Sequence, residues 1–467
     1  MSLKEDNLVK WYESVISNSG IAFPGLVKGT LFIGHRGWNI WEKIRDFIDA
    51  KYKQKGIKNV SFPTFIPVAE IEREKSRLSG FNPEIYLVSR SGDEERQNFF
   101  LRPTSEILFS HYFRNILESY EDLPLLFNQW CNVFRAEKNT KAFLRTCEFH
   151  WQEAHTLHLS KEEAMEYLKF FHETYKSLVK DLLNIAFLEG EKTVNERFPG
   201  SEKTLTLEAI MPDGQALQIA TSHYLSKNFT ETFDVKYTSR ENVVSYPHQL
   251  SAGCSTRLIG ALIMSHGDDS GLVLPLSMFD VHIKFLIING AVTEGSELHK
   301  KFSDELKGYK VEWDFSSRSF GYKIKNEEMI GTPVSVILGP SEIKSNWALV
   351  KTRLSESKVS IPMDQLISKI KETIDQYSSG LYSASQKNLE SSIVECSSLE
   401  EASHEILKNR KIALVPWFDD LQNEIDFKNE KLGFGPRCIK SRIVAPDTLC
   451  FYSKKPATAY VYFGRSY

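Results

Sequence analysis

A tight turn flanked by two strand-like segments constrains the fold of this chain most strongly. Residues 204–223 have the sequence TLTLEAIMPDGQALQIATSH, in which apolar and β-branched residues surround Pro212-Asp213-Gly214. Segments of this composition on either side of a Pro-Asp-Gly turn are typical of two paired strands. The sequence therefore predicts a β-hairpin near the middle of the chain.

A long helix is predicted just before this hairpin. Ser160 and Glu163 have the spacing of a capping box, which marks a helix N-terminus. Apolar residues then recur at helical spacing, namely Ala164, Leu168, Phe171, Leu178 and Leu182. Strands and helices are thus mixed in the first part of the chain.

A second unit, in which strands and helices alternate, is expected after the hairpin. Strand-like segments occupy residues 281–289, 333–339 and 346–352, and a charged helix follows the first of them. A further helix is predicted from about Met363 to Tyr377, and the Ser-rich stretch 378–398 is predicted to combine helix surface with a connector. Such alternation indicates a small α/β domain, and the final ~80 residues are expected to form a third unit.

Length and composition place the chain among globular proteins of several domains. With 467 residues, about three domains are expected at ~150 residues each. The 58 Lys and Arg residues nearly balance the 61 Asp and Glu residues, for a formal net charge of −3, and 41% of the residues are hydrophobic. This composition excludes a disordered chain and a strongly basic coat protein.

Nothing in the sequence indicates export. No window contains ~18 uncharged apolar residues, so no membrane span is expected. The N-terminal segment MSLKEDNLVKWYESV lacks the apolar core of a secretory signal. The six cysteines include no Cys-x-x-Cys pair, which argues against a disulfide framework. The expected location is the cytoplasm, where thiols stay reduced.

Four short clusters carry side chains suited to chemistry. In the first, Pro103 fixes the backbone, and Thr104 and Glu106 share one side if the segment is extended. A hydroxyl and a carboxylate side by side suit the capture of an ammonium group. The alternative is a helix N-cap at Thr104 or Ser105.

The second cluster spans residues 134–155, where arginines, acids and aromatic residues alternate in a predicted strand–loop–strand. Alternation would create two sets on common faces, Arg135 with Glu137, and Phe149 with Trp151 and Glu153. An arginine fork suits phosphate or carboxylate, an aromatic ring suits a purine, and Glu137 could accept from an exocyclic amine. The alternative is a solvated hairpin with an aromatic stripe.

The third and fourth clusters are less specific by themselves. Gln218 and His223 suit either a ligand site or a buried position satisfied by the backbone. Residues 248–257 lead through small side chains into a helix whose first turn carries Arg257, an arrangement that suits an anion or an ordinary helix entry. Cys254 is expected to be a small packed residue rather than a nucleophile.

In order, these clusters resemble the motifs of the prolyl-tRNA synthetases, which are class II aminoacyl-tRNA synthetases. The matching blocks are the Thr-x-Glu motif at 102–106, motif 2 at 134–137 and 145–155, the Gln-x-x-Thr-Ser-His element at 218–223, motif 3 at 251–257 with 266–269 and 271–275, and Tyr-Phe-Gly-Arg-Ser-Tyr at 462–467. About ninety residues separate motifs 2 and 3, which leaves no room for a large editing insertion. The resemblance is therefore to the archaeal and eukaryote-like type.

The resemblance implies a multidomain fold of the α+β and α/β classes. Residues 1–278 would form a class II antiparallel sheet flanked by helices, 279–385 an α/β anticodon-binding domain, and 386–467 a small C-terminal α/β domain. It also implies a homodimer, with motif 1 at about Ser61–Glu70 and its proline at Pro67.

The implied reaction is the attack of the L-proline carboxylate on the α-phosphate of ATP, followed by transfer of proline to tRNA(Pro). Arg135 and Arg257 would be the catalytic residues. The implied ATP site consists of Arg135, Glu137, Arg145, Phe149, Gln218, Thr221, Ser255 and Arg257. The implied proline site consists of Phe81, Thr104, Glu106, Arg135, Trp151, His155 and His223. ATP would carry Mg²⁺, for which Gln218 is a candidate contact, and Tyr322, Lys323 and Arg353 match the family's anticodon-reading strand region.

The C-terminal segment departs from the zinc-binding tails of many relatives. Trp417 and Phe418 stand where one pair of cysteine ligands would fall, and Cys450 alone remains of the other pair. The domain is therefore expected to hold no zinc and to pack on aromatic residues, which include Phe451 and Tyr452. Tyr467 is expected to dock against the catalytic domain.

Two other functions remain open at this point. One is a non-catalytic paralogue that binds tRNA or a partner, although the motif arginines, the Thr-x-Glu pair and the Thr-Ser-His element are all intact. The other is a synthetase for another amino acid such as threonine or serine, although the Cys/His zinc set of a threonine pocket is not evident. ATP–pyrophosphate exchange with proline and with other amino acids separates these readings.

Overall fold

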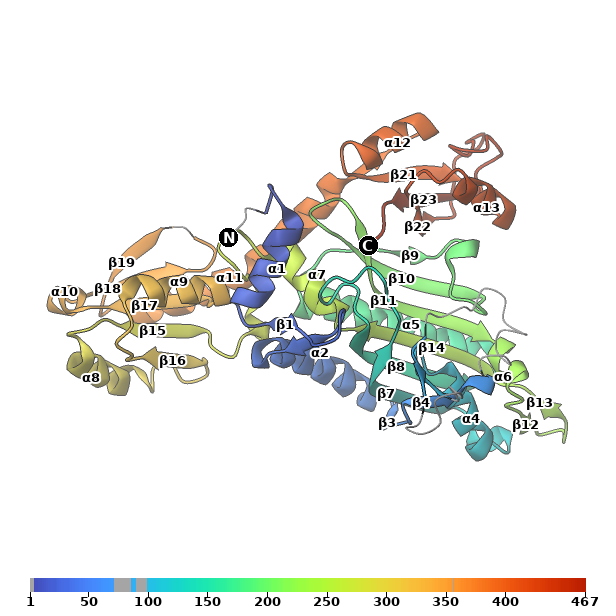
Figure 1. Ribbon diagram of the computed structural model, residues 1–467, viewed down its shortest axis with the longest axis horizontal. Helices are drawn as coiled ribbons and strands as arrows, with labels where there is room; N and C mark the ends of the chain where they lie inside the picture. Colours follow the sequence, from blue (N-terminus) through green and yellow to red (C-terminus); the bar gives the residue numbers. More distant parts are fainter. Residues whose placement is uncertain (1–3, 71–84, 90–98, 356) are drawn as a thin grey trace.

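The computed structural model describes residues 4–70, 85–89, 99–355 and 357–467, which form three parts along an elongated molecule (Figure 1). The N-terminal part lies in the middle, with the second, α/β unit at one end and the C-terminal unit packed beside the central sheet (Figure 1). Among the described residues, no helix is long and apolar enough to cross a bilayer.

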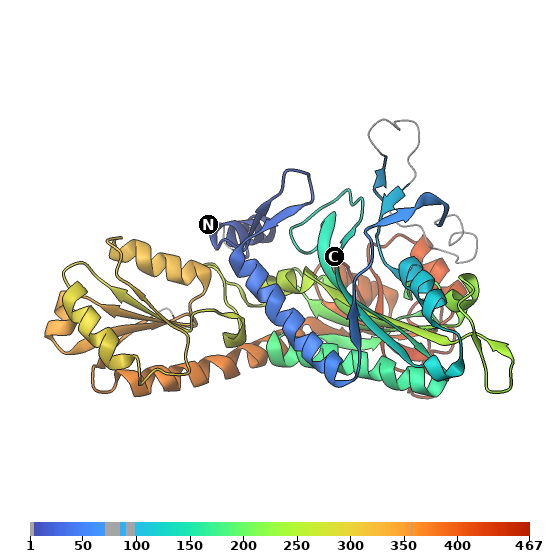
Figure 2. The same cartoon turned by 90° about the horizontal axis from the view of Figure 1, so that it is seen from below.

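The centre of the molecule is a sheet of seven strands, antiparallel except for the pairing of its edge strand with β7. In spatial order these strands are β9 (Leu188–Glu191), β10 (Lys203–Ile210), β11 (Ala216–Ser226), β14 (His248–Ser255), β8 (Glu148–His158), β7 (Leu125–Phe134) and β3 (Lys58–Val60). Four helices pack against it and share its main hydrophobic core, namely α1 (Leu8–Asn18), α2 (His35–Gln54), α5 (Lys161–Ser177) and α7 (Arg257–His266). Figure 2 shows α2 and α5 lying along one side of this sheet.

Smaller elements surround this sheet. The strands of two or three residues are β1 (Ala22–Pro24), β2 (Leu31–Ile33), β4 (Phe65–Pro67), β5 (Leu87–Val88), β6 (Phe99–Leu101), β12 (Tyr237–Thr238) and β13 (Val244–Ser245). Short helices are α4 (Glu106–Ile116), α6 (Asn228–Thr232) and the single turns Tyr120–Asp122, Leu178–Leu182, Val194–Glu196 and Leu276–Met278.

Both predictions for residues 160–223 are confirmed. The Ser160 hydroxyl accepts a hydrogen bond from the Glu163 amide at 3.2 Å and caps α5. Strands β10 and β11 pair antiparallel around the predicted turn, in which Gly214 has φ +75°. A Cβ at Gly214 would lie 1.9 Å from the carbonyl oxygen of Arg410, so the C-terminal unit presses directly on this turn.

The second unit has its own sheet and its own core, as predicted. Its strands are β16 (Val311–Asp314), β15 (Ile283–Ile287), β17 (Val334–Leu338), β18 (Trp347–Thr352) and β19 (Lys358–Pro362) in spatial order. Its helices are α8 (Val292–Phe302), α9 (Phe320–Ile330), α10 (Pro340–Lys344) and the start of α11 (Leu366–Ser392). The helix predicted to end near Tyr377 continues through most of the Ser-rich stretch, so the expected boundary at residue 385 falls inside α11.

The C-terminal unit extends the central sheet, which was not expected. Its strands continue the order from β9 as β22 (Gly435–Ser441), β23 (Ala459–Gly464), β21 (Ile412–Trp417) and β20 (Ile393–Glu395), giving eleven strands in all. Helices α12 (Leu399–Leu407) and α13 (Leu421–Asn429) complete it. A Cβ at Gly190 of β9 would lie 2.1 Å from the carbonyl oxygen of Ile439, so glycine permits the close approach of β22.

Aromatic side chains fill the core of the C-terminal unit, as predicted. The rings of Trp417, Phe427, Phe451 and Phe463 all contact one another, with centroids 5.0–5.9 Å apart. Cys450 is buried against this core, with its Sγ 3.9 Å from Nδ2 of Asn423. Within the described ranges, no three His, Cys, Asp or Glu side chains lie together as metal ligands.

Tyr467 docks against the N-terminal part, which confirms another expectation. Its hydroxyl donates to the Asp213 carboxylate at 2.8 Å, and its amide donates to the carbonyl oxygen of Ala216 at 3.1 Å. The ammonium of Lys141, from the loop between β7 and β8, lies 4.7 Å from the tyrosine ring centroid. The last segment of the described chain therefore touches both the central hairpin and the motif 2 loop.

Candidate active site

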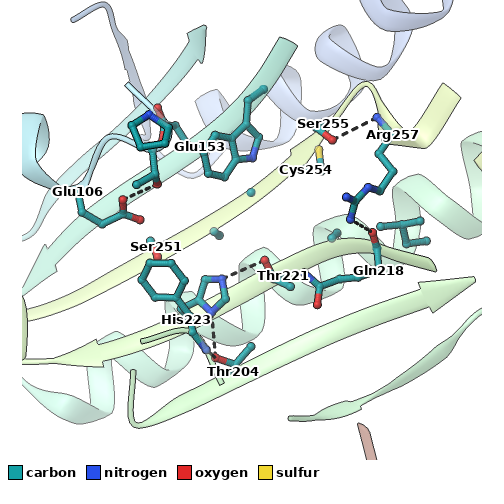
Figure 3. Close-up of a pocket in the computed structure, with 18 of the residues that line it drawn as sticks. Glu106, Glu153, Thr204, Gln218, Thr221, His223, Ser251, Cys254, Ser255 and Arg257 are labelled. Atoms are coloured by element: carbon teal, nitrogen blue, oxygen red, sulfur yellow. Dashed lines mark hydrogen bonds between the residues drawn. The ribbon is translucent and has the colours of Figure 1, made fainter. Parts of the chain in front are cut away.

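A cavity of about 490 Å³ opens on the central sheet (Figure 3). Strands β8, β11 and β14 form its floor, and residues 103–106 and 196–199 form parts of its wall. Eleven of the predicted site residues line it: Thr104, Glu106, Arg135, Phe149, Trp151, His155, Gln218, Thr221, His223, Ser255 and Arg257. Residues from four distant sequence clusters thus meet in one place.

The Thr104–Glu106 pair lies at the N-terminus of α4, so both interpretations of this cluster are partly right. Ser105 occupies the N-cap position, but its hydroxyl donates to the Glu153 carboxylate instead of capping the helix. The Thr104 hydroxyl donates to the carboxylate of Glu106, and both residues are buried. A hydroxyl and a carboxylate are therefore held together at the cavity wall, as an ammonium site requires.

Two buried carboxylates at this end of the cavity have opposite pKa shifts. Burial raises the pKa of Glu106 above its usual range, with the nearby Glu153 carboxylate adding to the shift. Burial acts in the same direction on Glu153, but His155 and hydrogen bonds from Ser105 and Gln129 bring its pKa below the usual range. This end of the cavity therefore holds negative charge that a bound cation would stabilise.

Two polar atoms here have no hydrogen-bond partner among the described residues. They are Oε2 of Glu153 and Nδ1 of His155, and both side chains are buried. The His155 ring stacks on Phe109 with centroids 4.1 Å apart, which fixes its orientation. An unpaired buried polar atom is costly, so these atoms indicate that a ligand with hydrogen-bonding groups belongs here.

Arg135 projects from the end of β7 over the aromatic residues of β8. Its guanidinium carbon lies 5.4 Å from the ring centroids of both Phe149 and Trp151, and its Nε donates to the carbonyl oxygen of Pro103 at 3.2 Å. Burial lowers the pKa of Arg135, while the carboxylates of Glu106, Glu137 and Glu153 oppose that shift. A fixed guanidinium beside carboxylates suits an anionic group of a substrate.

His223 links β11 to β10 beside this cavity. Its Nδ1 is hydrogen-bonded to Oγ1 of Thr204 at 2.9 Å and its Nε2 to Oγ1 of Thr221 at 3.0 Å. Burial, together with the charges of His155 and Lys192, lowers the pKa of His223 to about 3. The imidazole is thus neutral and rigidly held near pH 7, as a pocket wall rather than a charged group.

Arg257 and Gln218 lie at the end of the cavity away from Glu106 (Figure 3). The Arg257 guanidinium donates to the carbonyl oxygens of Leu144 at 2.9 Å and Gln218 at 3.1 Å. Burial, with repulsion from Arg135 and Arg145, lowers its pKa to about 10, so it remains a cation near pH 7. Ser255 accepts a hydrogen bond from the Arg257 amide at 3.2 Å and holds the first turn of α7.

Two of the predicted ATP-site residues are not on the cavity wall. Glu137 and Arg145 belong to the loop between β7 and β8, and the Arg145 guanidinium donates to the carbonyl oxygen of Tyr467 at 3.1 Å. Phe81, predicted to close over proline, lies outside the described residues.

Several lining residues were not assigned from the sequence. Glu153, Thr204, Arg197 and Phe198 line the cavity, and the Phe198 ring centroid lies 5.0 Å from that of His223. Glu153 shares a strand face with Phe149 and Trp151, a signal that was present in the alternation. The segment around Phe198 has no comparable signal, because a loop carries no periodicity.

The predicted anticodon residues require a correction. Gly321–Lys323 lies on helix α9, not on a strand. The Lys323 ammonium is buried and donates to the carbonyl oxygens of Ile287 and Asp314, and Arg353 is buried in an ion pair with Asp268. Both cations are committed to contacts within the protein, because an isolated buried charge is unfavourable. Tyr322, in contrast, is half exposed.

Comparison with known proteins first defines the class. The residues that line the cavity and six of the seven central strands, all except β3, fall within residues 86–266, which match the family model of the tRNA synthetase class II core domain (G, H, P, S and T). Residues 280–373 match an anticodon binding domain, and residues 400–467 match the prolyl-tRNA synthetase C-terminal domain.

Whole-chain relatives then define the family. The chain is 38% identical to a proline–tRNA ligase of Ureaplasma urealyticum, covering 99% of this chain and 98% of that protein, and 40% identical to one of Malacoplasma penetrans, covering 99% of each. A crystal structure of prolyl-tRNA synthetase from Cryptosporidium parvum with L-proline and AMP has 31% identity and a TM-score of 0.93, covering 100% of this chain and 96% of that one. The chain belongs to the proline–tRNA ligase family.

Proposed function

We propose that this protein activates L-proline with ATP to form prolyl-adenylate and then transfers proline to tRNA(Pro). The observation that carries this proposal is the buried Thr104–Glu106 pair beside Arg135 in one cavity. The first two groups suit the imino cation of proline, and Arg135 suits the carboxylate and the phosphate that react.

The proline end of the cavity is the one that holds Glu106. A secondary ammonium offers two N–H donors, and the oxygens of Thr104 and Glu106 can accept them. Trp151, His155 and His223 line the same region and would enclose the pyrrolidine ring. Since His223 is neutral near pH 7, it adds no positive charge beside the imino cation.

The nucleotide end is the one that holds Arg257 and Gln218. The Phe149 ring is available to stack on adenine, and the Arg257 guanidinium would hold the outer phosphates. Glu137 and Arg145, on the adjacent loop, belong to this proposed ATP site through the motif 2 resemblance. Fixed cations at both ends of the reacting groups stabilise the charge that develops at phosphorus without reorganisation.

Magnesium fits this site as a companion of ATP rather than as a resident ion. The described residues contain no cluster of three carboxylates, histidines or cysteines, whereas Gln218, whose side chain carries an amide oxygen, lines the cavity. Mg²⁺ commonly keeps its waters and binds substrate phosphates with one or two protein oxygens. When bound, it would neutralise phosphate charge, and Gln218 is the residue that would contact it.

The proposed macromolecular partners are tRNA and a second copy of the chain. Tyr322 is the residue proposed to contact the tRNA anticodon, because its exposed ring can stack on an unpaired base. A homodimer through the region Ser61–Glu70 and a zinc-free C-terminal unit are proposed on the family pattern and on the aromatic core around Trp417. The six free cysteines are compatible with a cytoplasmic location.

Proline-dependent ATP–pyrophosphate exchange is the direct test. Arg135→Ala removes the group proposed to stabilise charge at phosphorus, so its kcat should fall by about 100-fold or more while the fold is retained. Arg45→Ala, at a partly exposed position of α2 that does not line the cavity, is the control and should exchange like the wild type. An Arg135→Ala enzyme within a few-fold of wild type would refute the site assignment, and exchange with another amino acid in place of proline would refute the substrate.

A further inference from the structure

The C-terminal unit reaches into the wall of the cavity through one segment of the catalytic part. This segment, residues 192–199, follows β9 and is called here the pocket loop. Four of its residues, Glu196, Arg197, Phe198 and Pro199, line the cavity. Phe198 packs on the His223 ring, and its amide donates to the same Thr204 hydroxyl that is bonded to His223. The position of the pocket loop therefore determines one wall of the proline end.

Two contacts from the C-terminal unit hold the pocket loop near its start. Glu424 of α13 accepts hydrogen bonds from the Thr193 hydroxyl at 2.7 Å and from the Asn195 amide at 3.1 Å. Arg437 of β22 donates to Glu208 at 2.6 Å, and Glu208 in turn is bonded to the ammonium of Lys192. The loop is thus held by side chains more than 200 positions away in the sequence.

The burial of these groups makes the contacts specific rather than incidental. Glu424 is 2% exposed and Thr193 is fully buried, so water does not replace their hydrogen bond. Both carboxylate oxygens of Glu424 are used, one by a side chain and one by the backbone of the loop. Such a bidentate contact fixes orientation as well as distance.

We propose that Glu424 is a positioning residue for the proline pocket, acting through the pocket loop on Phe198 and His223. The inference rests on the proposed function, because it assigns His223 to the proline end. Glu424 does not touch the cavity, so its removal would loosen the wall without removing a group that contacts substrate. The Arg257 end is lined by other segments and should keep its affinity for ATP.

The test measures KM and kcat for proline and ATP in pyrophosphate exchange, using the full chain. Glu424→Ala should raise the proline KM about tenfold, the change that corresponds to ~1.4 kcal/mol, with kcat and the ATP KM within about twofold. Glu424→Gln retains an oxygen acceptor for Asn195 and an amide for Thr193, so it should restore most of the proline affinity. Asp426→Ala, on an exposed turn of the same helix, is the matched control and should behave as wild type.

A second variant keeps the test valid if Glu424→Ala does not fold. Thr193→Val removes one donor from the catalytic side and should raise the proline KM in the same direction, with a less than additive effect in the double variant. A proline KM within twofold of wild type in the folded variants would overturn the inference, as would a Glu424→Gln enzyme as impaired as Glu424→Ala. If the wild type shows no exchange with proline, the proposed function fails. If the wild type is active and the variants are unaffected, only the role of Glu424 fails.

Discussion

The C-terminal unit and the second α/β unit are attached to the N-terminal, catalytic part in different ways. The second unit is called here the anticodon-like unit, because residues 280–373 match an anticodon binding domain. The first continues the central sheet through β22 and β9 and shares the buried ion pairs of Glu208 with Lys192 and Arg437. The second has a separate sheet and core. Its contacts with the catalytic part include the ion pair of Arg353 with the half-exposed Asp268 and a hydrogen bond from the Leu272 amide to the carbonyl oxygen of Met329. The contrast indicates that one unit is part of the catalytic framework and the other is a docked module.

Removal of Arg437 should have the largest effect on the folded state. Arg437→Met leaves the fully buried Glu208 with one cation instead of two, and breaking a buried charge network costs about 3–5 kcal/mol. Urea unfolding of the whole chain measures this loss. Lys440→Met, at an exposed position of the same strand, is the control, and equal losses in both variants would contradict a framework role for the C-terminal unit.

The free energy of unfolding of the protein should depend on pH between about 4.5 and 6, because Glu424 is buried and its pKa is raised. Desolvation raises the pKa of Glu424 to about 6 from 4.5, with hydrogen bonds from Asn195 and Thr193 opposing the shift. The folded protein therefore binds more protons than the unfolded chain in this range, so the contribution of Glu424 is fully present below pH 4.5 and is lost as the pH rises through 6. The difference amounts to about 2 kcal/mol at most.

Denaturation of the wild type and of Glu424→Gln at pH 4.5, 5.5 and 7 measures this contribution. The stability of the wild type relative to the variant should fall across the series, because Gln does not titrate. Parallel pH profiles for the two proteins would show that Glu424 titrates as an exposed carboxyl does.

Loosening of the anticodon-like unit should cost less. Asp268→Asn removes the charge that pairs with the buried Arg353 but keeps an oxygen acceptor, so the loss of stability should be about 1.5–3 kcal/mol, the usual contribution of a hydrogen bond to a charged group. Proline-dependent exchange should be unchanged, while aminoacylation of tRNA should weaken. Asp269→Asn, next to it and exposed, serves as the control. Equal loss of exchange and aminoacylation in Asp268→Asn would show that this unit, too, belongs to the catalytic framework.

Tyr322→Ala should not alter the folded state measurably, because the ring is half exposed on α9. Its effect is expected in aminoacylation alone, where loss of one stacked base is worth about 1–3 kcal/mol. Tyr322→Phe keeps the ring and should stay near wild type. An aminoacylation rate that does not change in Tyr322→Ala would remove this residue from the anticodon site.

Local signals in the sequence predicted most of the elements that build the site. The capping of α5 by Ser160 and the turn at Pro212–Gly214 each depend on neighbours in sequence, and each is confirmed. The common face predicted for Phe149, Trp151 and Glu153 is also confirmed, because all three line the cavity. The cavity also contains eleven of the residues assigned to it by the family resemblance. Local periodicity, however, does not reveal which of these segments lie side by side in the folded protein. The family resemblance, recognised from the order of the motifs along the chain, predicted that they share one site.

Two features that the sequence did not predict depend on contacts between distant segments. A lysine in the sequence gives no sign that it is buried. Lys323 of α9 has a buried ammonium because Asp314 and the carbonyl oxygen of Ile287 in β15 accept its hydrogen bonds. The addition of β22 to the central sheet rests on a single residue pair, Ile439 with Glu191, and on the small size of Gly190. Neither feature alters the composition or periodicity of its segment.

Helix α11 connects the anticodon-like unit to the C-terminal unit. It runs from the anticodon-like unit to the start of the C-terminal strands, and near its middle the Tyr377 hydroxyl donates to the carbonyl oxygen of Leu274 in the catalytic part (Figure 1). Eight residues further along, the Ser385 hydroxyl accepts a hydrogen bond from the Ala186 amide at 2.9 Å, and Leu381 packs with Tyr377 and Val273 between these two points. The helix is therefore fixed to the catalytic part over a length of about 12 Å, at 1.5 Å per residue. A helix held along that length acts as a rigid strut, so the spacing between the second unit and the C-terminal strands is set by the catalytic part itself.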